Sequence, residues 1–208
     1  MGNVSIEIDF SISNIWRSWF KFRHGKRKIK ELENFQYFLE DNLWRLYLDL
    51  NEKSYTHGPY RHFTIQENKR RDIAVASVRD RVIHRLVYEY LVKIYDRSFI
   101  YDAWSCRKDK GLVGAIDRTE KFFKKYPRSF VWRADVTKFF DNIKHNVLAD
   151  VLFRRVKDVK AMWLIKIILE SYVSRPTNER ERERERNNPS GNTDRQSYQP
   201  DFCEYLFQ

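Results

Sequence analysis

The sequence is poor in cysteine and has no hydrophobic run long enough to cross a lipid bilayer. Its two cysteines, Cys106 and Cys203, are too few for a disulfide framework and lack the spacing of metal ligands. This indicates a reducing compartment. Position 6 is Ile6, where a myristoylation signal requires serine or threonine. We therefore expect a cytoplasmic protein without a membrane partner.

Basic residues outnumber acidic ones in this chain. The 208 residues include 40 lysines and arginines against 29 aspartates and glutamates, a formal net charge of +11. Such an excess favours a polyanionic partner, most simply nucleic acid. Hydrophobic residues make up 42% of the chain and aromatic residues 16%, which is enough to build a core and excludes disorder throughout.

Hydrophobic periodicity divides the first half of the chain into helices and one hairpin. Apolar residues recur at helical spacing within 12–20, 32–50 and 78–95. Between the last two segments, residues 60–66 and 71–77 alternate like two antiparallel strands. We therefore predict two opening helices, a β-hairpin, and a third helix that is basic on its solvent-exposed side.

The second half adds three more helical segments and one short strand. Helical patterns follow at 111–124, 145–155 and 159–173, and a short strand at 130–135 ends on Asp135. The order of helices, hairpin, helices, strand and helices predicts an α+β fold rather than a doubly wound sheet.

The segment at 133–143 carries the strongest chemical signal. A strand that delivers Asp135 at its end, followed by two phenylalanines, suits a polymerase palm, in which the carboxylate binds Mg²⁺ and a ring lies under the incoming sugar. Two metal ions held roughly 3.5–4 Å apart need further carboxylates. Taken alone, the pattern also fits the alternative that Asp135 and Asp141 are solvated loop acids or helix caps.

Several sequence blocks occur in an order that is specific to one enzyme family. They are YTHGPY at 55–60, NKRRDI at 68–73, VRDRVIH at 78–84, FIYDAWSCR at 99–107 followed by Lys110-Gly111, and RADVTKFFDNI at 133–143. In this order they resemble the reverse transcriptases of group II introns, retrons and diversity-generating retroelements. The resemblance covers residues 16–174, and the five ordered blocks are far more specific than any one of them.

The resemblance implies an RNA-directed DNA polymerase that uses an RNA template, a DNA primer, deoxynucleoside triphosphates and Mg²⁺. The implied fold is the fingers and incomplete palm of a right-hand polymerase, mostly helical with a short β-hairpin. Residues 1–129 would form N-terminal helices and fingers, and 130–174 the first part of the palm with the first catalytic aspartate. Residues 175–208 lie beyond the resemblance, and we expect them to form a charged, disordered tail.

The family's functional residues can be matched to positions of this sequence. Asp135 matches the first metal-binding, catalytic aspartate, and Val136 would add its backbone carbonyl to the ligand set. Phe140 matches the aromatic gate against ribonucleotides, because a 2′-hydroxyl would clash with its ring. Lys69 and Arg71 match the fingers residues that approach the triphosphate. The alternative for Lys69 and Arg71 is a solvated hairpin tip.

Four arginines are predicted to contact nucleic-acid phosphates: Arg79, Arg81, Arg85 and Arg107. For each of them alone, a solvated helix face is at least as good an interpretation. Asp80 is better interpreted as a structural partner of such an arginine than as a catalytic residue.

The remaining candidate ligands give weaker signals. His57, His62, His84 and His145 have no ligand spacing with one another, so we predict core or turn roles for them. Cys106 lies in an aromatic-rich segment and is predicted to be a small packed residue.

After Ser174 the family's next motifs, a Gly-rich segment and a Tyr-x-Asp-Asp turn, are absent. The chain continues with Glu-Arg repeats at 179–186, which suit either a solvated charged helix or out-of-frame translation. The genetic code supports the second interpretation, because codons allowed for 191–207, read one nucleotide later, can encode a stretch beginning Gly-Ile-Pro-Ile-Gly-Asn-Leu-Thr-Ser-Gln. We therefore expect a truncated enzyme that lacks the later catalytic aspartates.

Truncation would have physical consequences. Without the later aspartates the two-metal site cannot assemble, so we expect the chain to be inactive in primer extension. Apolar helices such as 159–173 would lose the strands on which they pack and leave hydrophobic surface exposed. The alternatives are a non-catalytic nucleic-acid-binding module and a purely structural helical domain.

Overall fold

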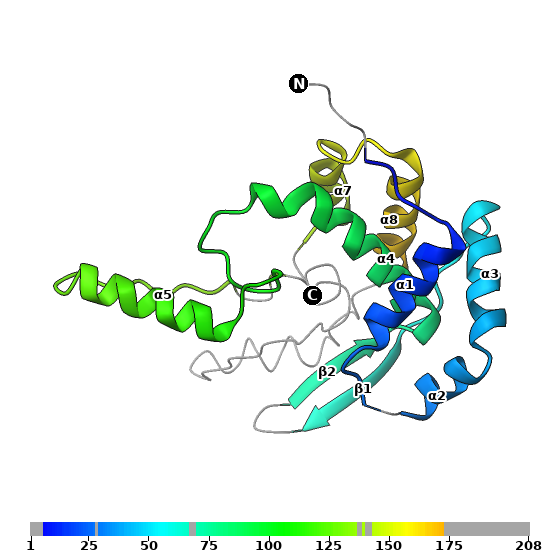
Figure 1. Cartoon of the computed structure of the whole chain (residues 1–208), viewed down its shortest axis with the longest axis horizontal. Helices are drawn as coiled ribbons and strands as arrows, with labels where there is room; N and C mark the ends of the chain where they lie inside the picture. The colour runs from blue at the N-terminus through cyan, green and yellow to red at the C-terminus, as the bar shows by residue number, and fades with distance from the viewer. Residues whose placement is uncertain (1–5, 28, 67–69, 137–138, 140–142, 173–208) are drawn as a thin grey trace, which may run out of the picture.

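The computed structural model describes residues 6–27, 29–66, 70–136, 139 and 143–172. Within these ranges, residues 70–72 are described by their backbone alone. These residues are mostly helical, with one two-stranded antiparallel sheet (Figure 1). In chain order the elements are α1 (Ile12–Arg23), α2 (Lys30–Tyr37), α3 (Leu39–Asn51), β1 (Arg61–Gln66), β2 (Arg70–Val75), α4 (Val78–Tyr95), the 3₁₀ turn η1 (Asp96–Ser98), α5 (Leu112–Lys125), α7 (His145–Phe153) and α8 (Val159–Ser171). None of the helices in this part of the chain combines the length and the hydropathy that crossing a bilayer requires.

Helix α4 forms the centre of the core. Eleven of its 18 residues are buried, and α1, α2 and α8 all pack against it (Figure 1). Ser77 caps its first turn by accepting a hydrogen bond from the Asp80 amide at 3.2 Å. Glu31 of α2 accepts from the Val78 amide at 3.1 Å. The predicted extent of this helix is confirmed. Of the three arginines expected on its other faces, Arg79 and Arg85 are partly exposed, whereas Arg81 is buried by the neighbouring helices.

The chain opens with three helices instead of the two predicted. The helical segment predicted at 32–50 is interrupted at Phe38, whose φ of −106° and ψ of 38° leave the helical range. The Asn42 side chain donates a hydrogen bond to the Phe35 carbonyl at 3.0 Å, which satisfies an acceptor close to the break. After the break, α3 still presents a leucine stripe to the core, as its periodicity predicted.

The two predicted strands pair as an antiparallel hairpin. The register runs from Arg61 opposite Val75 to Gln66 opposite Arg70. Ile73 is buried, and the hairpin projects away from the helices (Figure 1). This element is confirmed because alternation and the turn are local properties of the sequence.

Residues 130–136 form neither helix nor strand, so the strand predicted at 130–135 is wrong. Phe130 and Trp132 are almost fully exposed. A strand is stable only where a neighbouring strand pairs with its backbone groups. Within the described residues the sheet consists of β1 and β2, so alternation at 130–135 has no pairing partner there.

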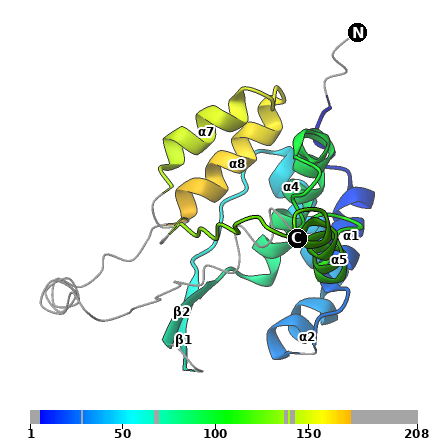
Figure 2. The same cartoon turned by 90° about the vertical axis from the view of Figure 1, so that its left-hand side faces the viewer.

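Helix α8 is packed into the core. Leu164, Ile165 and Ile168 are almost completely buried, and α4 and α7 lie against the helix (Figure 2). The expectation that 159–173 would lose its packing partners is therefore wrong, because helices rather than strands cover it. Exposed apolar surface occurs instead on α5, where no residue is buried.

Candidate functional site

One buried carboxylate joins two of the sequence blocks. Asp80, in the first turn of α4, is 1% exposed. Its Oδ1 accepts a hydrogen bond from the Tyr55 hydroxyl at 2.8 Å. Its Oδ2 accepts from the Ser77 hydroxyl at 2.7 Å and from the Gly58 amide at 3.2 Å. The stretch 55–60 is thereby fastened to the N-terminus of α4, where the helix dipole favours a carboxylate.

Arg79 is the arginine partner that was predicted for Asp80. Its guanidinium lies 3.4 Å from Asp80 Oδ1 and 2.5 Å from Asp49 Oδ2. It also donates to the Thr56 carbonyl at 3.0 Å and lies over the Tyr55 ring. The structural role predicted for Asp80 is confirmed, and two carboxylates neutralise the Arg79 charge.

The cluster is tightly packed and keeps its phenol neutral. Burial raises the pKa of Tyr55 far above its ordinary range, and the Asp80 carboxylate raises it further, so the hydroxyl remains a donor. A methyl group at Gly58 would lie 3.0 Å from Asp80 Oδ2, so a larger residue would push the carboxylate aside. The YTHGPY and VRDRVIH blocks therefore share one structural requirement.

The fold also brings together two histidines that are 27 residues apart. His57 Nε2 and His84 Nε2 lie 3.0 Å apart, and His57 Nδ1 lies 2.6 Å from the Gly58 carbonyl. Because a carbonyl only accepts, the proton of neutral His57 is on Nδ1, and its Nε2 accepts from His84. Core and turn roles are confirmed for these two, but their contact was not predicted. His62 and His145 are exposed in β1 and at the start of α7, so core roles are wrong for them.

The stability of the fold is expected to fall in acid because of His84. Burial, reinforced by His57 and Arg81 and opposed by Asp80, lowers the pKa of His84 to about 3. Below pH 6.5 the unfolded chain binds a proton there that the folded chain excludes. The contribution of neutral His84 to the free energy of unfolding is therefore complete above pH 6.5, and it is lost as the pH falls toward 3. We expect a loss of about 2 kcal/mol between pH 7 and pH 5, measured by urea unfolding.

A matched pair of variants isolates this effect from other titrating groups. His84→Gln keeps an N–H donor toward His57 but cannot titrate, so its loss between the two pH values should be about 2 kcal/mol smaller than that of the unsubstituted chain. His62→Gln removes an exposed histidine and should keep the full loss. Equal losses in the unsubstituted chain and His84→Gln would contradict the assignment.

Two further arginines of α4 also have acidic partners within the protein. Arg81 is 7% exposed, and its guanidinium lies 3.5 Å from Glu31 Oε1 and over the Phe22 ring. The Arg85 guanidinium lies 2.7 Å from Glu89 Oε1, one turn later on the same helix. A solvated helix face is therefore the wrong interpretation for Arg81, which packs between α1, α2 and α4.

Arg107 ties the block at 99–107 to the end of α4. Its Nε donates to Asp96 Oδ1 at 2.8 Å, and its terminal nitrogens donate to the carbonyls of Asp96 and Ile100. The hydrogen bond from Arg107 lowers the pKa of Asp96. All four arginines predicted to bind nucleic acid are thus paired with acids in the protein, and their contact with phosphates stays a prediction.

The same loop positions the start of α5. Arg118 donates two hydrogen bonds to the Asp102 carboxylate, at 2.8 and 3.1 Å. The Lys110 ammonium lies 4.8 Å from the centre of the Trp104 ring. A methyl group at Gly114 would lie 2.7 Å from that ring, so the helix approaches the ring as closely as glycine permits.

Cys106 does not pack in the core as predicted. It is exposed, and its Sγ lies 3.3 Å from the Ser105 hydroxyl. Its backbone has a left-handed φ of 58°. Such a conformation occurs in tight surface turns, which present their side chains to solvent.

The chain has a distant relative among known proteins. A stretch of 137 residues, 64% of this chain, is 28% identical to the COX1/OXI3 intron 2 protein of Saccharomyces cerevisiae (strain ATCC 204508 / S288c). The chain is distantly similar to an intron protein. It spans 16% of the length of that relative. No protein-family model matches the sequence. The similarity agrees with the resemblance to intron-type proteins, while the polymerase activity stays a prediction.

The predicted metal ligand Asp135 lies in the exposed stretch 130–136. Its Oδ1 accepts a hydrogen bond from the Val136 amide at 2.9 Å. In the part of the chain that the structure describes, no three His, Cys, Asp or Glu side chains lie close enough to hold a metal ion. Asp135 therefore does not by itself fit a two-Mg²⁺ site.

The predicted nucleotide-binding residues are mostly outside the described structure. Lys69 and Phe140 lie outside the described residues, as does the tail at 175–208. Arg71 lies in β2, opposite Ile65. The structure thus gives a backbone position for Arg71 alone, and the nucleotide-binding role of all three residues stays a prediction.

A different group of basic side chains is open to solvent on and after α5. Its members are Lys121, Lys125, Arg128 and Arg133. Among the described residues, none of them forms a salt bridge, in contrast to the four arginines predicted to bind nucleic acid. These four residues were not predicted as contacts, because charge alone does not reveal which basic residues have acidic partners. Exposed basic side chains without an acidic partner are candidates for contact with a polyanion.

Proposed function

We propose that this chain is part of an RNA-directed DNA polymerase encoded by an intron or another retroelement. Residues 1–129 would serve as N-terminal helices and fingers, and 130–174 as the start of the palm. Its template would be RNA and its primer DNA. The distant similarity to an intron protein supports the retroelement origin, and the five ordered blocks support the reaction.

The observation that carries the proposal is the meeting of three blocks at one helix. The Asp80 carboxylate joins YTHGPY to VRDRVIH at the start of α4. Arg107 ties FIYDAWSCR to its end. Three blocks that are separate in the sequence are therefore held together on one helix. A functional site built from several blocks requires such a rigid common scaffold.

The proposed nucleotide contacts come from two sequence blocks, NKRRDI at 68–73 and RADVTKFFDNI at 133–143. Lys69 and Arg71 would approach the triphosphate, and Phe140 the sugar. Asp135 and the Val136 carbonyl would contribute to a metal site that other carboxylates must complete. Because the described residues contain no group of three metal-ligand side chains, we expect no deoxynucleotide incorporation by this chain alone.

We expect the exposed basic residues of α5 to bind the template–primer. Substituting alanine for both Lys121 and Lys125 should weaken binding of an RNA template annealed to a DNA primer. It should also reduce the slope of log affinity against log salt by about 0.7–0.9 for each phosphate that the variant no longer neutralises. Fluorescence anisotropy over a salt series measures both quantities.

Two lysines of α8 provide the matched control. Lys160 and Lys166 are also exposed but lie on a helix away from α5 (Figure 1). Alanine at both positions should leave the salt slope unchanged. Equal effects of the two pairs would contradict a defined interface on α5, and binding independent of salt would contradict a nucleic-acid partner altogether.

A non-catalytic nucleic-acid-binding module is the second candidate, favoured because no three metal-ligand side chains come together among the described residues. The coding DNA after the Ser174 codon separates the two. A shifted frame encoding Gly-Asn-Leu-Thr-Ser-Gln and then Tyr-x-Asp-Asp would support the polymerase, and its absence would favour the module. Deoxynucleotide incorporation by the purified chain, abolished by Asp135→Asn, would contradict the module.

A further inference from the structure

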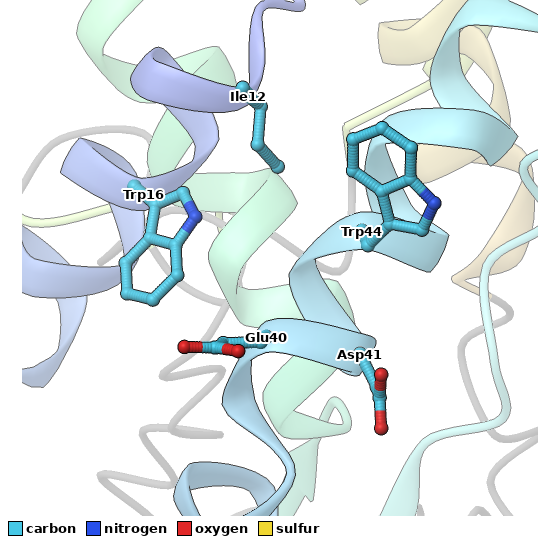
Figure 3. A pocket seen from close by; sticks show the side chains of 5 residues that line it. All are labelled: Ile12, Trp16, Glu40, Asp41 and Trp44. Carbon is cyan, nitrogen blue, oxygen red and sulfur yellow. The ribbon is translucent and has the colours of Figure 1, made fainter.

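A shallow pocket of about 320 Å³ opens between α1 and α3, outside all five sequence blocks. It is lined by Ile12, Trp16, Glu40, Asp41 and Trp44. Figure 3 shows the two indole rings on either side of the opening, with the Glu40 carboxylate at the edge between them. The volume lies at the lower end of the range of ligand pockets, which suits a small group.

Helical spacing places the lining residues on facing surfaces. Ile12 and Trp16 lie one turn apart on α1, and Glu40 and Trp44 lie one turn apart on α3. The core beneath the pocket holds both helices through the buried side chains of Ile15, Trp19, Leu43 and Leu46. The pocket is therefore preformed and needs no rearrangement of the two helices to accept a ligand.

Neighbouring rings hold the two tryptophans in place. Trp16 contacts Phe20 with a centroid distance of 5.9 Å, and Trp44 stacks on Tyr47 at 5.1 Å. Although its ring is supported on one side, Trp44 is still 52% exposed. A large aromatic surface is thus held rigid and open to solvent beside the pocket.

The pocket carries two acidic side chains without a cation. Glu40 and Asp41 lie in the first turn of α3, where the helix dipole favours acidic residues. Among the described residues, neither carboxylate forms a salt bridge or a hydrogen bond. In a chain with a net charge of +11, they make a local negative site beside two aromatic rings.

We propose that this pocket binds the side chain of an arginine presented by a partner protein. A planar guanidinium stacks on indole faces and donates in parallel to a carboxylate, so it complements both features of the pocket. The two carboxylates repel phosphates, which excludes the nucleic-acid backbone as the occupant. The partner is therefore a basic polypeptide segment with one arginine that inserts between the rings.

The test uses a capped Gly-Ser peptide with a single arginine, titrated into the full chain and followed by NMR of the six tryptophan indole N–H signals. We expect the signals of Trp16 and Trp44 to shift and that of Trp132 to stay in place. A peptide with citrulline, which has nearly the same shape without the charge, should bind roughly tenfold more weakly. A lysine peptide should also bind more weakly, because it lacks the planar fork.

Variants of the two acids test the charge contribution while preserving side-chain shape. Glu40→Gln combined with Asp41→Asn should weaken arginine-peptide binding roughly tenfold, while Glu33→Gln with Glu52→Gln, which removes exposed acids outside the pocket, should not. Unchanged remaining indole signals would show that the fold is intact. The proposal is overturned by equal binding of the citrulline or lysine peptide, by an RNA oligonucleotide that shifts both signals, or by no shift with arginine.

Discussion

Replacement of Asp80 by alanine is expected to lower the free energy of unfolding by about 3–5 kcal/mol, the usual cost of removing one member of a buried ionic network. The substitution leaves the Tyr55 hydroxyl and the Gly58 amide without their acceptor. Arg79 would keep Asp49 as its remaining carboxylate partner. Each buried group left unsatisfied costs about 1–3 kcal/mol, so the loss should exceed that of any one hydrogen bond.

Urea unfolding followed by circular dichroism measures this loss. Asp135→Ala is the matched control, because Asp135 is exposed and accepts from its own neighbour's amide; it should change the free energy of unfolding by less than about 0.5 kcal/mol. Asp80→Asn keeps the shape and one acceptor oxygen, so its loss should be intermediate. If Asp80→Ala were no more destabilising than Asp135→Ala, the role assigned to Asp80 would be wrong.

Leu164→Ala is expected to cost about 2–5 kcal/mol, because it removes a completely buried side chain and leaves a cavity. Leu164 lies on α8, the helix that the sequence alone predicts to be without packing partners. In the structure it belongs to the same core as α1, α3 and α4. A large cost would show that this core stabilises the chain in solution.

Val159→Ala is the control on the same helix. Val159 is 78% exposed at the start of α8, so its truncation removes little buried surface and should cost less than about 0.5 kcal/mol. Thermal or urea unfolding of both variants gives the comparison. Similar small losses would mean that α8 is not docked in solution, in agreement with the expectation from the sequence.

Folding and catalysis are expected to depend on different residues of this chain. Asp80, Leu164 and their neighbours stabilise the helical core, whereas Asp135 lies in an exposed stretch and belongs to no group of three metal-ligand side chains among the described residues. A chain that unfolds cooperatively but incorporates no deoxynucleotide would match both the observed core and the proposed incomplete site. The apolar surface of α5 would still favour association.

The local elements could be predicted because their causes are local. Helix α4 was predicted with its observed ends, since its apolar spacing and its Ser77 cap lie within one segment. The hairpin was predicted because its alternating residues and its turn also lie within one short segment. The break at Phe38 was not, because leucine spacing continues across it and gives no sign of the interruption.

Side-chain pairing could be predicted only where the two partners are close in the sequence. An aspartate flanked by arginines at 79–81 suggested an ion pair, and the pairing of Asp80 with Arg79 confirmed it. The contact between His57 and His84 had no such signal. Nor could the sequence reveal that Arg81 would be buried against Glu31, because that pair spans 50 residues.

The sequence by itself determined the helices, the hairpin and the order of the blocks, because spacing and turn residues act over a few positions. Only the tertiary structure decided which charges are neutralised, which histidines meet, and that residues 130–136 form no strand. Burial, ion pairing and strand pairing depend on neighbours from distant parts of the chain, and no local pattern specifies those neighbours.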